Sequence, residues 1–298
     1  MEKGVYKPKV KYDKWWLILL FVLPAMFFYG LFNLVGIIRT FYYSTMDWRG
    51  ISANRDFIGL ANYIEVAKDP AFWNALKNNL ILVLVSLFIQ MPGALLLALL
   101  INAKIRFTKF FRTVFFMPML LSTVATGIMW ILFYDPNFGL LALIIRKLGL
   151  PISTAFLQGS SALPAILFVI CWQFIPYYMI IFKAGLTNVP EELYEAGKLD
   201  GAGSWQCFRY ITIPMLMPTI RTSAVLQLVG SLKYFDLFYV MMGGSPNANT
   251  ELMATYMYKK GFTEFKMGYA STIASYMFLI CFVLACAFLF MTSRRKEE

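Results

Sequence analysis

The 298-residue sequence contains no histidine and few charged residues of any kind. Aspartate, glutamate, lysine and arginine make up 14% of the residues, whereas 59% are hydrophobic. Soluble domains carry about 25% charged residues, so this composition excludes an ordinary soluble fold and indicates an integral membrane protein. The lack of histidine excludes catalytic triads, metal sites and proton relays that depend on an imidazole ring.

Cysteine is also scarce, with residues Cys171, Cys207, Cys281 and Cys286 only. Three of them fall in apolar runs and Cys207 falls in a polar loop. None lies in an expected external loop and none forms a CxxC pair, so we predict neither a disulfide nor a cysteine metal site. The net charge of +11 is expected to come from lysine and arginine near the cytoplasmic ends of membrane spans, rather than from nucleic-acid binding.

Six apolar runs are long enough to cross a membrane as helices. They cover residues 15–38, 79–101, 114–134, 163–181, 215–242 and 267–291. The first run is too long for the core of a cleaved signal peptide, so it should remain as a span. The second contains Pro92-Gly93, which can kink it.

The stretches between the runs predict the orientation of the chain. We place residues 43–77 outside as short helices, the last of them over residues 69–76. Residues 140–145 are apolar but too short to cross, residues 243–250 are rich in turn formers, and residues 251–266 should form another outer helix. The inside stretches hold more lysine and arginine than the outside ones, which are longer, so both termini are expected in the cytoplasm.

One membrane domain over residues 15–292 accounts for almost the whole chain. A basic tail (residues 1–14) precedes it and a short tail (residues 293–298) follows it, both expected on the cytoplasmic side. We find no internal repeat and no low-complexity linker that would divide this domain.

Residues 188–214 form a polar stretch between the fourth and fifth runs. Pro190 suits the first turn of a helix, where its missing N–H costs nothing. Gly201 suits a left-handed C-terminal cap, and Ser204 can cap a second short helix that Pro214 would end. We therefore predict a helix–turn–helix element held between two spans.

Two of the apolar runs contain polar and aromatic residues that are unusual at membrane depth. They are Gln173, Phe174 and Tyr177 in the fourth run, and Gln227, Gly230, Ser231 and Tyr234 in the fifth. Polar groups at this depth usually face a cavity, and amides and hydroxyls beside aromatic rings suit a polyhydroxylated ligand. The alternative is that the polar groups join helices by hydrogen bonds while the rings fill the bundle.

Lys233 and Asp236 lie three residues apart in the fifth run, a spacing at which they can form an intramembrane ion pair. An unneutralised Lys233 would instead favour an anionic solute. The spans show no cluster of catalytic residues, which argues against a membrane-embedded enzyme.

The polar stretch carries a pattern of fixed spacing: Glu195-Ala196-Gly197, three residues, Gly201, nine residues, and then Ile-Thr-Ile-Pro at residues 211–214. It resembles the "EAA" loop found in membrane subunits of ATP-driven (ABC) importers. Gly197 stands where alanine is usual, which can loosen the helix by up to about 1 kcal/mol. Other pieces resemble the carbohydrate-uptake branch, and in particular the maltose-type first permease. They are residues 57–63, 72–79, 193–203, 233–250 and 268–276.

This resemblance implies an all-α integral membrane fold, a six-transmembrane-helix bundle of the type I ABC importer kind, in a bacterial cytoplasmic membrane. It implies a permease subunit for a sugar or oligosaccharide, and not an enzyme. The implied partners are a second, homologous permease, a cytoplasmic ABC ATPase dimer and an extracytoplasmic solute-binding protein. ATP and magnesium would be used by the ATPase, and this chain would bind no cofactor. A phosphate-binding loop is indeed missing, since Gly197-Lys198 is followed by Leu199 and not by Ser or Thr.

The resemblance also assigns roles to residues. It assigns docking onto the ATPase to Glu195, Ala196, Gly197, Asp200 and Gly201. The sugar contacts of the maltose-type relative, counted from the polar stretch, fall on the seven polar and aromatic residues named above for the fourth and fifth runs. Several identities differ from those of the relative, which leaves the particular sugar open. There are two alternatives. The same architecture could import a polyol or a glycerol-phosphate-type solute, or the chain could be an ion-coupled carrier that needs no ATPase.

Overall fold

The structure, a computed structural model, describes residues 15–52, 54–103 and 108–293. The predicted N-terminal basic tail therefore lies outside the described residues, as does the C-terminal tail beyond Ser293.

Helices dominate the described part of the chain, and five are long and apolar enough to cross a membrane. They cover Trp15–Ser44, Pro70–Asn102, Gly159–Thr187, Ser204–Met241 and Met267–Met291. A sixth candidate is the pair Phe110–Leu120 and Thr123–Phe133, whose two parts are bent by 97°. Each of the six predicted spans thus has a counterpart in the all-α fold.

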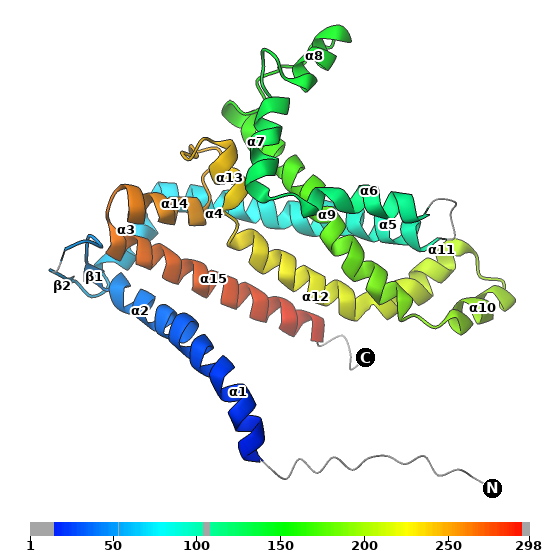
Figure 1. Cartoon of the computed structure of the whole chain (residues 1–298), viewed down its shortest axis with the longest axis horizontal. Coiled ribbons are helices and arrows are strands. Elements are labelled where there is room, and N and C mark those ends of the chain that lie inside the picture. Colours follow the sequence, from blue (N-terminus) through cyan, green and yellow to red (C-terminus); the bar gives the residue numbers. More distant parts are fainter. Residues whose placement is uncertain (1–14, 53, 104–107, 294–298) are drawn as a thin grey trace.

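The first span consists of α1 (Trp15–Tyr29), the π-helix η1 (Gly30–Leu34) and α2 (Val35–Ser44). α1 has no buried residue and extends away from the rest of the molecule (Figure 1). Two short antiparallel strands follow, β1 (Met46–Asp47) and β2 (Asp56–Phe57), and then the helix α3 (Ala61–Lys68).

The second span is longer than predicted. α4 (Pro70–Val85), the π-helix η2 (Ser86–Gln90) and α5 (Met91–Asn102) form one continuous helix, so the separate outer helix expected over residues 69–76 is wrong. Asp69 starts α4, because its side chain accepts a hydrogen bond from the Ala71 N–H at 2.9 Å. Pro92 is the second residue of α5, just after η2, so a π-helical turn accommodates this proline within the span.

The third span is broken rather than continuous. α6 (Thr108–Leu120) and α7 (Thr123–Phe133) meet at 97°, and Ser122 between them has an extended backbone. Pro118 in the last turn of α6 weakens the helix just before this bend. The apolar piece after this span forms α8 (Leu140–Lys147), a helix too short to cross a membrane.

The remaining elements follow the predicted order along the chain. They are η3 (Gly159–Ser161), α9 (Ala162–Thr187), α10 (Glu191–Leu199), α11 (Ser204–Cys207), η4 (Phe208–Thr212), α12 (Ile213–Leu232), α13 (Asp236–Met241), α14 (Met253–Tyr258), η5 (Lys259–Thr263) and α15 (Met267–Ser293). The fifth span differs from the prediction, because residues 233–235 separate α12 from α13.

Three details of the predicted helix–turn–helix element are wrong. Pro190 occupies the N-cap position before α10, with an extended backbone, and not the first turn. Gly203, and not Ser204, caps α11, and its N–H donates to Oε1 of Gln206 at 2.7 Å. Pro214 does not end the helix, because α11, η4 and α12 run on without a break and η4 accommodates the proline as η2 accommodates Pro92.

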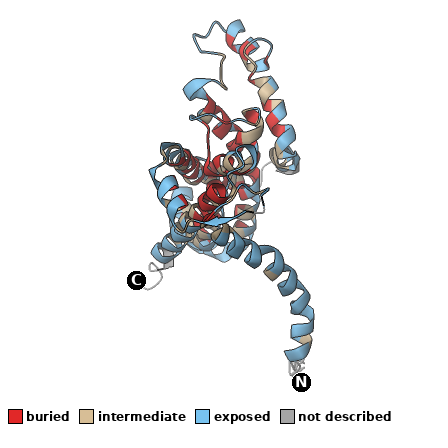
Figure 2. Ribbon diagram, turned by 90° about the vertical axis from the view of Figure 1, so that its left-hand side faces the viewer, coloured by how far each residue is buried: buried red, intermediate tan, exposed pale blue. Residues whose placement is uncertain are grey.

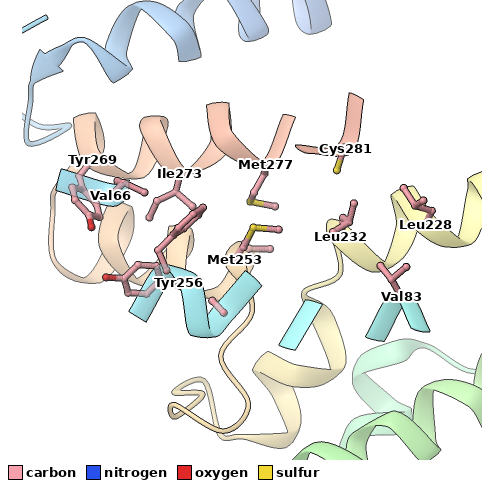
Figure 3. Close-up of a cluster of buried hydrophobic side chains, with 13 residues drawn as sticks. Val66, Val83, Leu228, Leu232, Met253, Tyr256, Tyr269, Ile273, Met277 and Cys281 are labelled. Atoms are coloured by element: carbon pink, nitrogen blue, oxygen red, sulfur yellow. The ribbon is translucent and has the colours of Figure 1, made fainter. Parts of the chain in front are cut away.

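Buried apolar side chains join segments that lie far apart in the chain. One cluster joins α3, α4, α12, α14 and α15, and Figure 3 shows Met253 of α14 beside Met277 of α15. Figure 2 shows the buried residues gathered in the centre of the molecule, whereas α1 is exposed. β1, β2 and α3 lie at one end of the long axis and α10 lies at the other, as the predicted outer and cytoplasmic sides require (Figure 1).

Asp69 links three elements at the outer end. The hydroxyls of Tyr256 in α14 and Tyr269 in α15 both donate to Oδ2 of Asp69, the second at 2.6 Å. Burial acts to raise the pKa of this carboxyl, but the two hydroxyls, the Ala71 N–H and the charge of Lys260 outweigh burial and lower the pKa. The folded protein therefore stabilises the ionised form of Asp69.

We predict that Asp69→Ala lowers the stability of the fold by at least about 1 kcal/mol, because the N-cap and both tyrosine contacts are lost. A carboxyl whose pKa is lowered in the folded state stabilises the fold at pH values above the ordinary carboxyl pKa. This stabilisation is lost as the pH falls through the folded-state pKa. In detergent, the unfolding temperature of the variant should therefore lie below that of wild type at pH 7, and the difference should become smaller below about pH 4. Asp56→Ala, at an exposed position of β2, is the control and should unfold at almost the same temperature as wild type. A difference for Asp69→Ala that does not change with pH would contradict the prediction.

Candidate functional site

A small cavity lies inside the bundle beside the break in the fifth span. Its volume is about 100 Å³, and α4, η2, α9, α12 and the break all contribute to it. The lining residues are Leu82, Ser86, Gln90, Ile170, Phe174, Tyr178, Gln227, Gly230, Ser231 and Tyr234.

Five of the seven residues predicted for a substrate path line this cavity. They are Phe174, Gln227, Gly230, Ser231 and Tyr234. The face of the fifth span that the sequence indicated therefore does line one space, and Phe174 of the fourth span joins it. The ring of Phe174 packs edge-to-face on that of Tyr234, with centroids 6.1 Å apart.

The other two predicted residues do not line the cavity. Nε2 of Gln173 donates to the carbonyl of Leu121 at 3.3 Å, so this side chain supports the bend between α6 and α7. Tyr177 is 38% exposed and packs edge-to-face on Tyr178, which takes its place in the lining. The four-residue spacing of Gln173 and Tyr177 identified a shared face, but that face points elsewhere.

The structure adds residues from the second span that the sequence analysis missed. Ser86 and Gln90 of η2 lie one helical turn apart, and both reach the cavity. The hydroxyl oxygens of Ser86 and Ser231 are 2.9 Å apart and hydrogen bond across the helices. Two polar residues in an otherwise apolar run gave a sequence pattern that would have identified them.

The polar groups of the cavity are incompletely satisfied. Gln227 is 2% exposed, and neither its amide nitrogen nor its amide oxygen has a hydrogen-bond partner among the described residues. The hydroxyl oxygen of Tyr234 is likewise buried without a partner in the described part of the chain. A buried polar group without a partner is costly, and these groups are free to donate to and accept from a bound molecule or water.

The volume of the cavity sets a limit on what it holds in this conformation. Small-molecule sites usually measure about 300–1,000 Å³, and a cavity of about 100 Å³ has room for a few water molecules. A larger ligand requires that the helices move apart or that the wall is completed by another chain.

Lys233 and Asp236 form no ion pair in the described part of the chain, so this predicted pair is not present. The reason is that α12 ends at Leu232, and the two residues therefore share no helical face. Lys233 instead lines a separate, mostly apolar cavity of about 420 Å³ together with Met257 and Cys281. Its charge does not enter the small polar cavity.

The predicted coupling residues lie on and just after α10, at the end of the molecule opposite β1 and β2 (Figure 1). Glu195, Ala196, Asp200 and Gly201 are exposed, and Gly201 has the positive φ of +80° that the predicted turn requires. Large apolar side chains are exposed nearby, with Leu199 90%, Trp205 71% and Tyr210 74% accessible. This end therefore offers carboxylates and apolar area to a partner.

Contacts within the element fix α10 against the following helix. The hydroxyls of Tyr194 and Thr212 are 2.9 Å apart. A Cβ atom added at Gly197 would lie 3.1 Å from Cδ1 of Ile211, so the glycine permits a close approach of α10 to η4. These contacts link α10 to the helix that lines the cavity.

Comparisons with known proteins agree with these features. Residues 90–296 match the family described as "Binding-protein-dependent transport system inner membrane component". A "Probable ABC transporter permease protein" of Pyrococcus horikoshii is 38% identical over 287 residues, which cover 94% of this chain and 97% of the relative. The "Multiple sugar-binding transport system permease protein" of Streptococcus mutans is 32% identical over 273 residues, 91% of both chains. A chain in the crystal structure of a bacterial ABC transporter involved in alginate import has the same fold, with a TM-score of 0.83 and 22% identity over 95% of this chain and 96% of that one.

We predict opposite stability effects for two buried tyrosines. The hydroxyl of Tyr134 donates to the carbonyl of Ala165 at 3.1 Å, whereas that of Tyr234 has no partner among the described residues. Tyr134→Phe should therefore destabilise the fold by about 1 kcal/mol, and Tyr234→Phe should be neutral or stabilising. Thermal unfolding of both variants in detergent checks this. A loss of stability for Tyr234→Phe as large as that for Tyr134→Phe would show that the hydroxyl of Tyr234 is satisfied.

Proposed function

This chain belongs to the family of inner membrane components of binding-protein-dependent transport systems, and we propose that it forms, with a second permease, the membrane path for a sugar or oligosaccharide. The family is that of ABC transporter permeases, which are multi-pass membrane subunits and not enzymes. ATP hydrolysis is performed by a separate subunit.

The observation that carries the sugar assignment is the set of unpartnered polar groups in the small cavity. Gln227 offers one amide donor group and one acceptor, and Tyr234 adds a hydroxyl. The rings of Phe174 and Tyr234 stand beside these groups and can pack on the apolar face of a sugar ring. A molecule rich in hydroxyls satisfies both kinds of surface, and the name of the Streptococcus mutans relative points to sugars as well.

The small volume of the cavity supports a shared site. This chain supplies one wall, and a second, homologous permease supplies the other. An extracytoplasmic binding protein delivers the sugar to the outer face. Lys233 lies in a different cavity, so it supplies no cation to the path, and nothing in the cavity itself favours an anionic solute over a neutral one.

The coupling function belongs to α10 and the turn after it. Glu195 and Asp200 offer carboxylates to basic side chains of the ATPase, and Leu199, Trp205 and Tyr210 offer apolar area. The ATPase dimer holds ATP and magnesium, and this chain holds no cofactor. Closure of the ATPases on ATP displaces α10, and the bundle changes from an inward-open to an outward-open state.

We predict that a binding protein loaded with the correct sugar stimulates ATP hydrolysis by the whole transporter in lipid. A panel of mono- and oligosaccharides, polyols and glycerol phosphates, each offered with the binding protein, identifies the substrate class. Gln227→Leu should reduce the stimulated rate about tenfold or more, since two ligand hydrogen bonds are lost. Stimulation by a glycerol phosphate or a polyol, with no response to any sugar, would overturn the sugar assignment.

We also predict that Glu195→Lys uncouples or disassembles the transporter, because it replaces a carboxylate by a cation at the ATPase contact. The matched control is Glu191→Lys, which makes the same charge change in the first turn of the same helix. Co-purification of the ATPase and stimulated hydrolysis measure the outcome. Normal assembly and stimulation with Glu195→Lys would remove this residue from the coupling site, and transport that persists without any ATPase would support an ion-coupled carrier instead.

A further inference from the structure

The break between α12 and α13 creates a problem for the backbone. α12 ends at Leu232, inside the candidate membrane span Ser204–Met241. The last carbonyl groups of a helix have no N–H partner in a following turn. Inside a membrane, such groups must be satisfied by the protein itself. Ser231 and Tyr234, which line the polar cavity, stand on either side of this helix end.

The carbonyl of Ser231 accepts a long hydrogen bond from the N–H of Tyr234 at 3.4 Å, and one side chain from the second span supplies shorter donors to this helix end. Nδ2 of Asn79 donates to the carbonyl of Ser231 at 2.8 Å and to that of Leu232 at 3.3 Å. Oδ1 of Asn79 accepts from the N–H of Met253 at 2.9 Å, which is the first residue of α14. Asn79 is completely buried, so a single amide caps the end of α12 and the start of α14 together.

The same face of α4 holds the outer loop that connects α13 to α14. Nδ2 of Asn78 donates to the carbonyl of Glu251 at 2.9 Å, and Nδ2 of Asn74 donates to the carbonyl of Ala248. Further along the same helix, Ser86 and Gln90 line the cavity. One side of α4 and η2 therefore runs from the outer loop, past the capped helix end, to the polar cavity.

We propose that Asn79 is a positioning residue that couples the outer loop, through α14, to the wall of the polar cavity. A movement of the loop that displaces Met253 also displaces the amide that holds the carbonyls of Ser231 and Leu232. The position of this helix end sets the positions of Ser231 and Tyr234. Asn79 does not line the cavity, so it acts on the path only through these neighbours.

This inference rests on the proposed function, since it assumes that the cavity is part of the transport path. It adds a route by which an event at the outer face, such as docking of the binding protein, changes the cavity. The outer loop and α14 lie at the end of the molecule that carries β1, β2 and α3 (Figure 1).

The test is Asn79→Asp in the complete transporter, with both permeases, the ATPase and the binding protein, in lipid nanodiscs. The aspartate keeps the shape and the acceptor for the Met253 N–H, but in place of the two amide donors it offers the Ser231 and Leu232 carbonyls at most the single proton of a neutral carboxyl. We expect basal ATP hydrolysis within about twofold of wild type and a fall of about tenfold in the stimulation by loaded binding protein.

The matched control is Asn62→Asp. Asn62 is also buried, and its Nδ2 donates to the carbonyls of Ser44 and Met46, at 2.9 and 3.0 Å, in a region that does not line the cavity. The same substitution there changes an amide that also donates to two backbone carbonyls. Parallel losses of stimulation in the two variants, or normal stimulation with Asn79→Asp, would overturn the proposal.

A second variant decides the case if Asn79→Asp does not assemble. Asn74→Ala, at a partly exposed position, removes the shorter of two side-chain contacts to the Ala248 carbonyl and leaves the longer one from Nδ2 of Asn78, at 3.3 Å. We expect it to assemble normally and to lower the stimulation about threefold with unchanged basal hydrolysis, whereas full stimulation would contradict a coupling through this loop. If wild type itself responds to no loaded binding protein, the proposed function fails. If the wild type and the variants are all stimulated equally by loaded binding protein, the proposed function stands and only this inference is refuted.

Discussion

The capping of a helix end inside the membrane is the constraint on which the rest of the site depends. A broken span exposes backbone carbonyls at membrane depth, and each unpaired group would cost several kcal/mol in lipid. Asn79 satisfies those of Ser231 and Leu232 from another helix. The break can therefore persist, and it places Tyr234 in the cavity beside Ser231 and directs Lys233 into a different cavity.

The continuity of the fifth span at its other end gives the site a mechanical connection. α11, η4 and α12 form one helix that extends from Ser204 to Leu232, and the Tyr194–Thr212 contact attaches α10 to it. We propose that a displacement of α10 is passed to Gln227 along this helix, which continues through both Pro214 and Pro218. In our account, the exposed coupling end and the outer loop act on the same cavity from opposite sides of the membrane.

Much of this arrangement could be predicted from the sequence, because apolar runs and the spacing of the polar stretch are local features. Five cavity residues were predicted from polar and aromatic residues at membrane depth together with the family resemblance. The break at residues 233–235 could not be predicted, since it contains neither proline nor glycine and depends on Asn79, about 150 residues away in the chain. The continuous helix through Pro214 was missed for the opposite reason: proline indicates a helix end, but a π-helical turn before it accommodates the ring.

The central claim is that the space around Gln227 and Tyr234 holds the transported sugar. A cryo-electron microscopy structure of the complete transporter, trapped with ATP bound and with the loaded binding protein docked, tests it most directly. We expect an enlarged cavity with sugar density within hydrogen-bonding distance of the Gln227 amide and the Tyr234 hydroxyl, and with a ring face against Phe174. Sugar density elsewhere in the membrane, with these side chains still packed around a few waters, would contradict it.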